Sequence, residues 1–201
     1  MDEHFIISVG RQLGSGGHII GKLLSEKFQI PFYDKELIGA AAAESGLSKE
    51  MFEQADEQVN PTSTGGLLSD YFQHNYFSNE TLFQLQSDVI RNIASRESAV
   101  IMGRCADYVL RDQRRCISLF ITADMPDRVK RVMEYQHLSD KKAEALIAKA
   151  DKKRAGYYYY YSNKIWGSAA SYHLCINSSV LGIENTAEYI REFITLRLGV
   201  K

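Results

Sequence analysis

A glycine-rich turn near the N-terminus holds the residues of this chain that are best suited to chemistry. The sequence VGRQLGSGGH follows a short apolar run and precedes a stretch with helical spacing of its apolar residues. Glycines there allow backbone N–H groups to converge on an anion, and a helix N-terminus adds a favourable dipole. The pattern predicts a phosphate-binding loop, although a plain glycine-rich strand-to-helix turn is the alternative. The residues predicted to face the phosphates are Gly14, Ser15, Gly16, Gly17, His18 and Ile19.

Two side chains of the usual G-x-x-x-x-G-K-[ST] loop are missing from this turn. When Gly14 and Gly16 are placed on the Gly-x-Gly of that pattern, Gly17 replaces the lysine and His18 replaces the magnesium-binding Ser or Thr. A triphosphate still needs cations, because the charge on a transferring phosphoryl group is stabilised chiefly by electrostatics. Arg11 is therefore the candidate replacement for the lysine, and an ordinary surface arginine is the alternative.

The elements that must position this loop alternate along the chain. Apolar runs of strand length are separated by stretches in which apolar residues recur at helical spacing. Continuous apolar strands between helices predict a parallel sheet covered on both faces, with ligands at the carboxyl ends of its strands. The predicted strands are 5–9, 99–102, 116–122 and 173–177, with a brief extended segment at 31–33, and the later predicted helices start near Asn79, Asp124, Ser139 (ending near Gly156) and Glu184.

Composition narrows the classes of partner. The chain has 201 residues and a formal net charge of -1, which gives no electrostatic reason to expect nucleic acid or a membrane surface as a partner. A basic cluster at 149–154 is the sole feature in favour of nucleic acid. Three widely spaced cysteines suit reduced thiols and no zinc site. Without a signal peptide or a long apolar stretch, the sequence predicts a cytoplasmic protein.

Four segments together resemble the cytidylate-kinase-like group of P-loop nucleoside monophosphate kinases, over nearly the whole chain. They are ISVGRQLGSGGHIIGKLLSEKFQIPFYDKELI, AVIMGRCADYVL, the stretch from Ser118 to Tyr161, and HLCINSSVLGIENTAEYIREFI. The resemblance implies a three-layer α/β P-loop NTPase fold in a single domain, residues 1–201. It also implies a helical substrate-binding insert at 46–97, hinged around 61–66, and a helical lid region at 138–162.

The resemblance assigns the acceptor site to residues that follow two of the strands. Asp34 would face the monophosphate, Arg104 would hold its phosphate, and Asp107 would help to position the nucleotide. An arginine fork suits bidentate phosphate recognition. A helix cap for Asp34 and a helix-start arginine for Arg104 are the alternatives. Met102 stands where relatives carry an acidic residue before the glycine.

The lid assignment depends on a helix that carries a family-like Asp-x-x-Arg. Asp151 and Arg154 match that pattern, whereas Ile147 stands where many relatives have a further arginine. With Arg11, these two residues form the predicted catalytic set. The lysines of the same helix more simply make a solvated basic face. The five tyrosines at 157–161 are expected to pack the helix against the core rather than to stack on a base.

The resemblance implies an enzyme that transfers the γ-phosphoryl group of ATP to CMP or a similar nucleotide. ATP would be the co-substrate and Mg²⁺ would arrive with it, with no metal ligands assigned on the protein. Small-molecule nucleotides are the expected partners, and a homo-oligomer is possible. Two alternatives stay open: a non-catalytic nucleotide-binding protein with a degenerate loop, and a P-loop kinase of another small acceptor.

Overall fold

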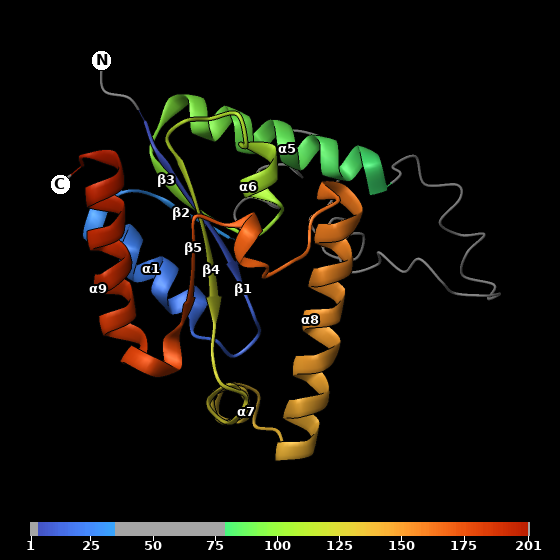
Figure 1. Cartoon of the computed structure of the whole chain (residues 1–201). Coiled ribbons are helices and arrows are strands. Elements are labelled where there is room, and N and C mark those ends of the chain that lie inside the picture. The colour runs from blue at the N-terminus through green and yellow to red at the C-terminus, as the bar shows by residue number, and fades with distance from the viewer. Residues whose placement is uncertain (1–3, 35–78, 201) are drawn as a thin grey trace.

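The computed structural model describes residues 4–34 and 79–200, which contain a five-stranded parallel sheet (Figure 1). Its strand order is β2-β3-β1-β4-β5, so β1 pairs with β3 on one side and with β4 on the other. The central strands are short and almost wholly buried, as the sequence predicts for a sheet covered on both faces. The strand bounds are β1 Ile6–Arg11, β2 Phe32–Tyr33, β3 Ala99–Met102, β4 Cys116–Thr122 and β5 Leu174–Asn177.

Helices lie on both faces of the sheet, which confirms the predicted three-layer α/β arrangement. Helices α1 (Gly17–Phe28) and α9 (Ser178–Leu198) cover one face. Helices α5 (Asn79–Arg96) and α6 (Ala106–Val109) cover the other. A short 3-10 turn at Ala169–Ser171 precedes β5.

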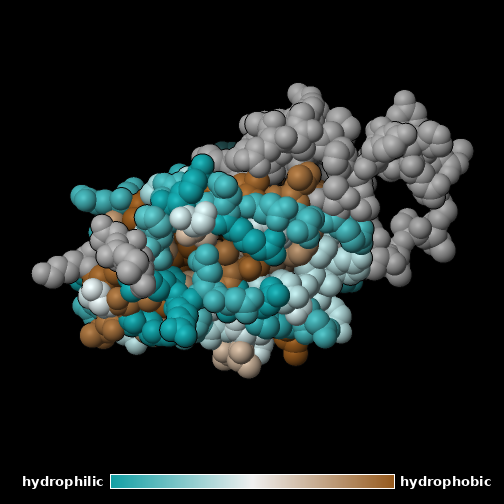
Figure 2. Space-filling view, turned by 90° about the horizontal axis from the view of Figure 1, so that it is seen from above, coloured by the Kyte–Doolittle hydropathy of each residue, from teal (hydrophilic) through white to brown (hydrophobic). Residues whose placement is uncertain are grey.

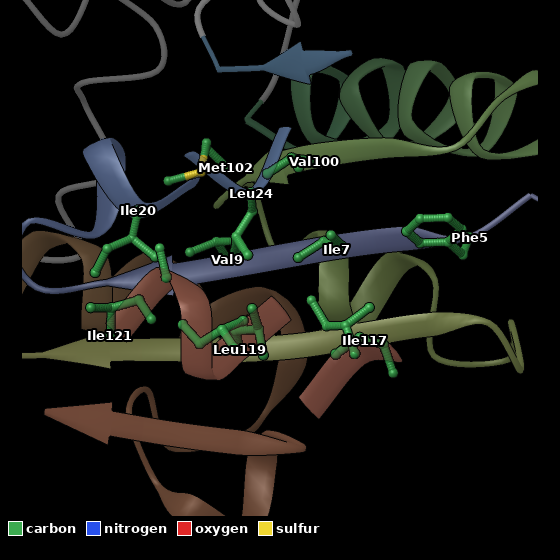
Figure 3. Close-up of a cluster of buried hydrophobic side chains, with 13 residues drawn as sticks. Phe5, Ile7, Val9, Ile20, Leu24, Val100, Met102, Ile117, Leu119 and Ile121 are labelled. Carbon is green, nitrogen blue, oxygen red and sulfur yellow. The ribbon is translucent and has the colours of Figure 1, made fainter. Parts of the chain in front are cut away.

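Alternating side chains of the strands divide the core between these two faces. Ile7 and Val9 of β1 point toward α1 and α9 together with Leu119 of β4, as Figure 3 shows. Ile6 belongs to the opposite cluster, with Ile101 of β3 and apolar residues of α5 and α6. Period-two alternation within each strand therefore fixes which helices each strand residue meets.

Helices α7 (Met125–Gln136) and α8 (Asp140–Ser162) extend from the carboxyl end of the sheet, where α8 runs upright beside it (Figure 1). Helix α8 continues past Gly156, where the sequence predicts its end. A single glycine does not stop this helix because the following tyrosines are held: Tyr158 is buried, and Tyr161 stacks on Phe83 of α5 with ring centroids 3.9 Å apart. The tyrosines thus join α8 to its neighbours, whereas Tyr159 is exposed.

Several local expectations differ from the structure. Asp124 and Ser139 occupy the N-cap positions of α7 and α8, but neither side chain caps its helix. Asp124 instead accepts a hydrogen bond from Asn177 Nδ2 at 2.8 Å. Helix α9 begins before the predicted start at Glu184, and a kink at Gly182 (φ +74°) separates its first turn from the rest.

The predicted insert falls mostly outside the described residues, which contain only its last helix, α5. Within the described ranges, none of the helices has the length and apolar character needed to span a bilayer. The face in Figure 2 is mostly hydrophilic, with apolar residues visible between the polar ones. The three cysteines are free thiols.

Candidate functional site

Residues 12–16 join β1 to α1 at the carboxyl end of the sheet, the edge at which ligands of such folds bind. Gly14 (φ +78°) and Gly16 (φ +76°) adopt a left-handed conformation that side chains rarely allow. A Cβ atom on Gly14 would lie 2.6 Å from the carbonyl oxygen of Arg128, and one on Gly16 would lie 2.9 Å from Cδ1 of Ile183. Both positions therefore require glycine, for conformation and for space.

The carbonyl oxygens of residues 11 to 15 all accept hydrogen bonds from the rest of the protein. The donors and acceptors are Arg154 Nη1 to Arg11 O (3.0 Å), Ser15 Oγ to Gln12 O (2.9 Å), Arg128 Nε to Leu13 O (2.8 Å), Arg131 Nη1 to Gly14 O (3.0 Å) and Ser178 Oγ to Ser15 O (2.6 Å). Carbonyl oxygens repel anions, so engaging them elsewhere leaves a surface dominated by N–H groups. The N–H groups of the first turn of α1 lack intrahelical partners and add to that surface.

Arg11 occupies the space that a side chain at position 17 would need. A Cβ atom on Gly17 would lie 2.7 Å from Cβ of Arg11, so the loop has no room for the usual lysine there. The Arg11 guanidinium lies beside the loop with Nη2 3.4 Å from Asp34 Oδ1. Burial lowers the pKa of Arg11, against the opposing charge of Asp34. Arg11 thus supplies the positive charge next to the loop.

His18 occupies the position of the usual Ser or Thr, and its side chain contacts Asp34. Its Nδ1 lies 3.1 Å from Asp34 Oδ2, and its ring packs edge-on against Phe32. Partial burial lowers the pKa of His18, although the Asp34 charge opposes this, so the ring is mainly neutral at pH 7. Within the described ranges, no three His, Cys, Asp or Glu residues gather into a group that could hold a metal.

A strained turn follows β3 at the same edge of the sheet. Three consecutive residues have positive φ angles: Gly103 (+73°), Arg104 (+55°) and Cys105 (+54°). The turn is closed by the N–H of Ala106, which donates to Gly103 O at 3.0 Å. Non-glycine residues in this conformation cost on the order of 1–3 kcal/mol each and cluster at functional sites. The turn directs Arg104 into a cavity beside Arg11.

Three guanidinium groups meet at this edge of the sheet. Arg154 of α8 donates to the carbonyl oxygen of Arg11 and so stands next to the loop. Burial and, after it, repulsion from Arg11 lower the pKa of Arg154 to about 10, while Asp151 and Asp34 oppose the shift. The charge of Arg104 likewise lowers the pKa of Arg11. Buried, mutually repelling cations indicate a site built for an anion.

Two cavities share Arg11 and Arg154. We call the first, of about 340 Å³, the inner cavity; besides those two residues it is lined by Gly10, Asp34, Met102, Gly103, Arg104, Cys105, Asp107, Ala150, Lys153, Tyr157, Tyr158, Trp166 and Tyr172. We call the second, of about 450 Å³, the loop groove; its other lining residues are Gln12, Leu13, Gly14, Gly16, Gly17, His18, Ile19, Val132, Tyr135, Gln136 and Leu146. The predicted phosphate-facing residues other than Ser15 line the loop groove, and the predicted acceptor residues line the inner cavity. Ser15 is buried beneath the loop.

The inner cavity combines cations with an aromatic wall and a buried carboxyl group. Tyr158 donates a hydrogen bond to Asp107 Oδ2 at 2.6 Å, and its ring stacks on Tyr172. Burial raises the pKa of Asp107, although the hydrogen bond from Tyr158 opposes the shift. Trp166 packs edge-on against Phe120 behind the wall. Such a cavity suits a planar, polar ligand that also carries negative charge.

Asp151 lies apart from both cavities. Its Oδ1 accepts a hydrogen bond from the N–H of Leu13 at 2.9 Å, and its Oδ2 pairs with Arg128. Ile147, one turn earlier on α8, is buried between α7 and α8. The helix therefore presents Arg154 to the site and uses Asp151 to contact the loop.

Some residues of the site were not singled out by the sequence pattern. Arg128 and Arg131 lie on α7, the helix that follows β4, and contact the loop, so their place on the helix after a strand was a usable signal. Trp166 and Tyr172 lie in irregular chain between α8 and β5, where no periodicity marks them. Lys149 and Lys152 are exposed, as expected of a solvated face, whereas Lys153 lines the inner cavity.

Comparison with known proteins agrees with this geometry. The model of the cytidylate kinase-like family matches residues 6–180. A crystal structure of an uncharacterized protein from Eubacterium ventriosum is similar at 30% identity and a TM-score of 0.73, covering 95% of this chain and 98% of that one. The search of curated proteins found no match.

Two shikimate kinases share the fold at lower identity. The enzyme from Bacteroides thetaiotaomicron has a TM-score of 0.56 at 17% identity, covering 94% of this chain and 98% of its own. The enzyme from Acinetobacter baumannii, solved with shikimate, has a TM-score of 0.53 at 15% identity, covering 98% and 96%. The family match, the three-layer fold and the glycine-rich loop agree: this chain belongs to the cytidylate kinase-like family and has a P-loop kinase fold.

Proposed function

We propose that this protein is a phosphotransferase that moves the γ-phosphoryl group of ATP to CMP or a similar nucleoside monophosphate. The observation that carries the proposal is the placement of Arg11 and Arg154 in both cavities, with Arg104 in the inner one. Phosphoryl transfer needs the donor and the acceptor to bind on opposite sides of the cationic groups that stabilise the transferring phosphoryl group. These two cavities supply that arrangement.

On the donor side, the phosphates of ATP lie along the loop groove. The N–H groups of Gly14, Gly16 and His18 bind the phosphate oxygens, since those of Ser15 and Gly17 donate within the loop, and Arg11 replaces the missing lysine as the fixed cation. Mg²⁺ comes with the nucleotide and neutralises phosphate charge when bound, since it commonly binds substrate phosphates with few protein ligands. The protein contributes orientation and a fixed electrostatic field.

On the acceptor side, the monophosphate enters the inner cavity. Arg104 binds its phosphate, and Asp34 and Asp107 orient the rest of the nucleotide beside the aromatic wall. The cavity volume of about 340 Å³ falls in the lower part of the usual range for small-molecule sites, about 300–1,000 Å³. An ionised phosphate oxygen of the acceptor attacks in line, so no general base is required.

During transfer, charge spreads over the oxygens of the moving phosphoryl group. Arg154 and Arg11 stand between donor and acceptor and stabilise that charge. Because they are already buried and held, little reorganisation accompanies the reaction. Arg154 acts from α8, in the region assigned to the lid.

The direct test is turnover of the purified chain with ATP and a panel of monophosphates that includes CMP. We expect formation of a nucleoside diphosphate, and a loss of kcat of about 10²–10³-fold in Arg154→Ala, the usual effect of removing one electrostatic donor. Lys149→Ala, an exposed change on the same helix, is the matched control and should leave turnover unaltered. Binding of ATP without diphosphate formation from any monophosphate would favour a non-catalytic nucleotide-binding protein.

A second candidate is a kinase of another small acceptor. Its support is the compact inner cavity and the fold shared with shikimate kinases. A thermal-shift panel separates the two, because a ligand at 100 times its Kd stabilises the native state by about 2.7 kcal/mol. Stabilisation by a hydroxyl-bearing metabolite, and by none of the monophosphates, would select this candidate.

A further inference from the structure

The peptide groups flanking Leu13 are held on both sides by one buried ion pair. Asp151 of α8 accepts the N–H of Leu13 at 2.9 Å, and Arg128 of α7 donates through Nε to the carbonyl oxygen of Leu13 at 2.8 Å. Arg128 also pairs with Asp151, so the two side chains and the backbone of Leu13 form a closed set. Arg128 is only 4% exposed.

The side chain of Leu13 is anchored by the same two helices. It packs against the small apolar cluster between α7 and α8, whose buried members are Val129, Val132, Ala143 and Ile147. Leu13 is therefore fixed through its side chain, its N–H and its carbonyl oxygen. The loop cannot rotate at this residue without disturbing the packing of α7 on α8.

This attachment lies directly before the glycines that turn toward the groove. Gly14 and Gly16 adopt left-handed conformations, and glycine has no intrinsic preference that would keep them there. A restraint at residue 13 thus limits the conformations that the following N–H groups sample. Pairing with Arg128 also compensates the charge of Asp151, which would otherwise repel a phosphate in the neighbouring groove.

We infer that Arg128 and Asp151 are positioning residues that hold the Leu13 backbone so that the N–H groups of Gly14, Gly16 and His18 converge on phosphate. This inference rests on the proposed function, since it requires that the loop bind a polyphosphate. It changes the role of Asp151 from a predicted catalytic residue to one that acts through the loop. It also adds Arg128, on a helix outside the predicted lid.

If the ion pair had only a structural role, the variants would be expected to behave differently. Removing one member of a buried pair destabilises a protein whatever its role, so loss of stability does not test the inference. The discriminating variable is whether an acceptor for the Leu13 N–H remains. Asp151→Asn keeps an amide oxygen that can accept this hydrogen bond, whereas Asp151→Ala removes it.

The experiment is calorimetric titration of the full chain with inorganic tripolyphosphate, alongside melting temperatures. We expect Asp151→Ala to bind at least about tenfold more weakly than the wild type, the effect of losing one hydrogen bond to a charged acceptor. Asp151→Asn should retain most of the affinity, within about threefold. Glu188→Gln breaks ion pairs with Lys27 of α1 and with Arg191 of α9, the helix that carries Glu188 itself, and should leave affinity unchanged while lowering stability.

Because single changes can impair folding, the double variant Arg128→Met with Asp151→Leu completes the test. The double replacement leaves no uncompensated buried charge, although the N–H and carbonyl oxygen of Leu13 lose their partners. This variant should therefore melt closer to the wild type than Asp151→Ala does and still bind tripolyphosphate at least about tenfold more weakly. Equal affinity in the double variant and the wild type, or in Asp151→Ala and Asp151→Asn, would overturn the inference alone. A wild-type chain that fails to bind tripolyphosphate would overturn the phosphate site of the proposed function as well.

Discussion

The phosphate loop and the turn after β3 lie at the same edge of the sheet but are built by opposite means. In the loop, Gly14 and Gly16 take left-handed conformations at no steric cost and expose the backbone. In the turn, Arg104 and Cys105 adopt the same region despite their side chains. A backbone surface recognises any phosphate of suitable spacing, whereas a directed side chain responds to the shape of its ligand. On the proposed function, the loop would serve general phosphate binding and the inner cavity would serve selectivity.

The largest expected effect on KM tests whether Arg104 serves the inner cavity alone. Arg104→Ala should raise the KM for the acceptor monophosphate by about tenfold or more, since it removes a charged hydrogen-bond donor. The KM for ATP should change little, because Arg104 lines only the inner cavity. Initial rates with each substrate varied in turn give both constants. An equal rise in the two KM values would contradict the assignment of Arg104 to the inner cavity alone.

An effect on stability, rather than on KM, tests the glycine of the loop against a glycine without such a role. Gly14→Ala should destabilise the fold by about 2–4 kcal/mol, from the left-handed backbone and the contact with Arg128. Gly156→Ala, in the interior of α8 with no atom within 4 Å of the added Cβ, should instead stabilise by about 0.5–1 kcal/mol. Urea unfolding of both variants provides the measurement. Similar free energies for the two would mean that the loop tolerates side chains.

The fluorescence of the single tryptophan should report on the inner cavity and not on the loop groove. Trp166 lines the inner cavity and is the sole tryptophan of the chain. We expect its fluorescence to change on titration with CMP and to stay nearly constant with tripolyphosphate, which binds in the loop groove. The variant Trp166→Phe should abolish the signal. A tripolyphosphate response as large as that of CMP would show that the two cavities are coupled.

The smallest expected effect concerns the pH dependence of stability. Burial raises the pKa of Asp107, so its ionised form opposes folding increasingly as the pH rises through that pKa. Asparagine at this position cannot ionise and can still accept the Tyr158 hydrogen bond. The melting temperature of Asp107→Asn should therefore exceed that of the wild type at pH ~8, and the difference should shrink toward pH ~4. Asp112→Asn, at a side chain that is 90% exposed, should show no such trend; a constant difference for Asp107→Asn would contradict the assignment.

Much of the fold could be predicted because buried strands leave a clear apolar signature. The strand Cys116–Thr122 was predicted at its observed bounds, and the glycine spacing located the loop between β1 and α1. Helix ends were less certain because tertiary contacts override local signals. Asp124 hydrogen-bonds to Asn177 instead of capping α7, and Gly156 lies within α8 because packed tyrosines continue the helix.

The site was predictable to the extent that it depends on strand ends and glycines. Arg104 and Asp34 follow strands, and the structure places both beside Arg11. The aromatic wall comes from irregular chain, so no periodic pattern could bring Trp166 to the same cavity. The contact of Asp151 with Leu13 joins residues 138 positions apart, which spacing alone does not reveal.

The clash at Gly17 has a consequence for how such loops can diverge. Because Cβ of a residue at 17 would overlap Cβ of Arg11, a lysine at 17 excludes the present arginine and every other side chain at 11. No single substitution converts the arginine-bearing loop into a lysine-bearing one. Lysine at 17 alone would be overcrowded, and loss of the arginine at 11 alone would leave no cation at either position. Only a paired change, to glycine at 11 and lysine at 17, would therefore convert this loop into a lysine-bearing one.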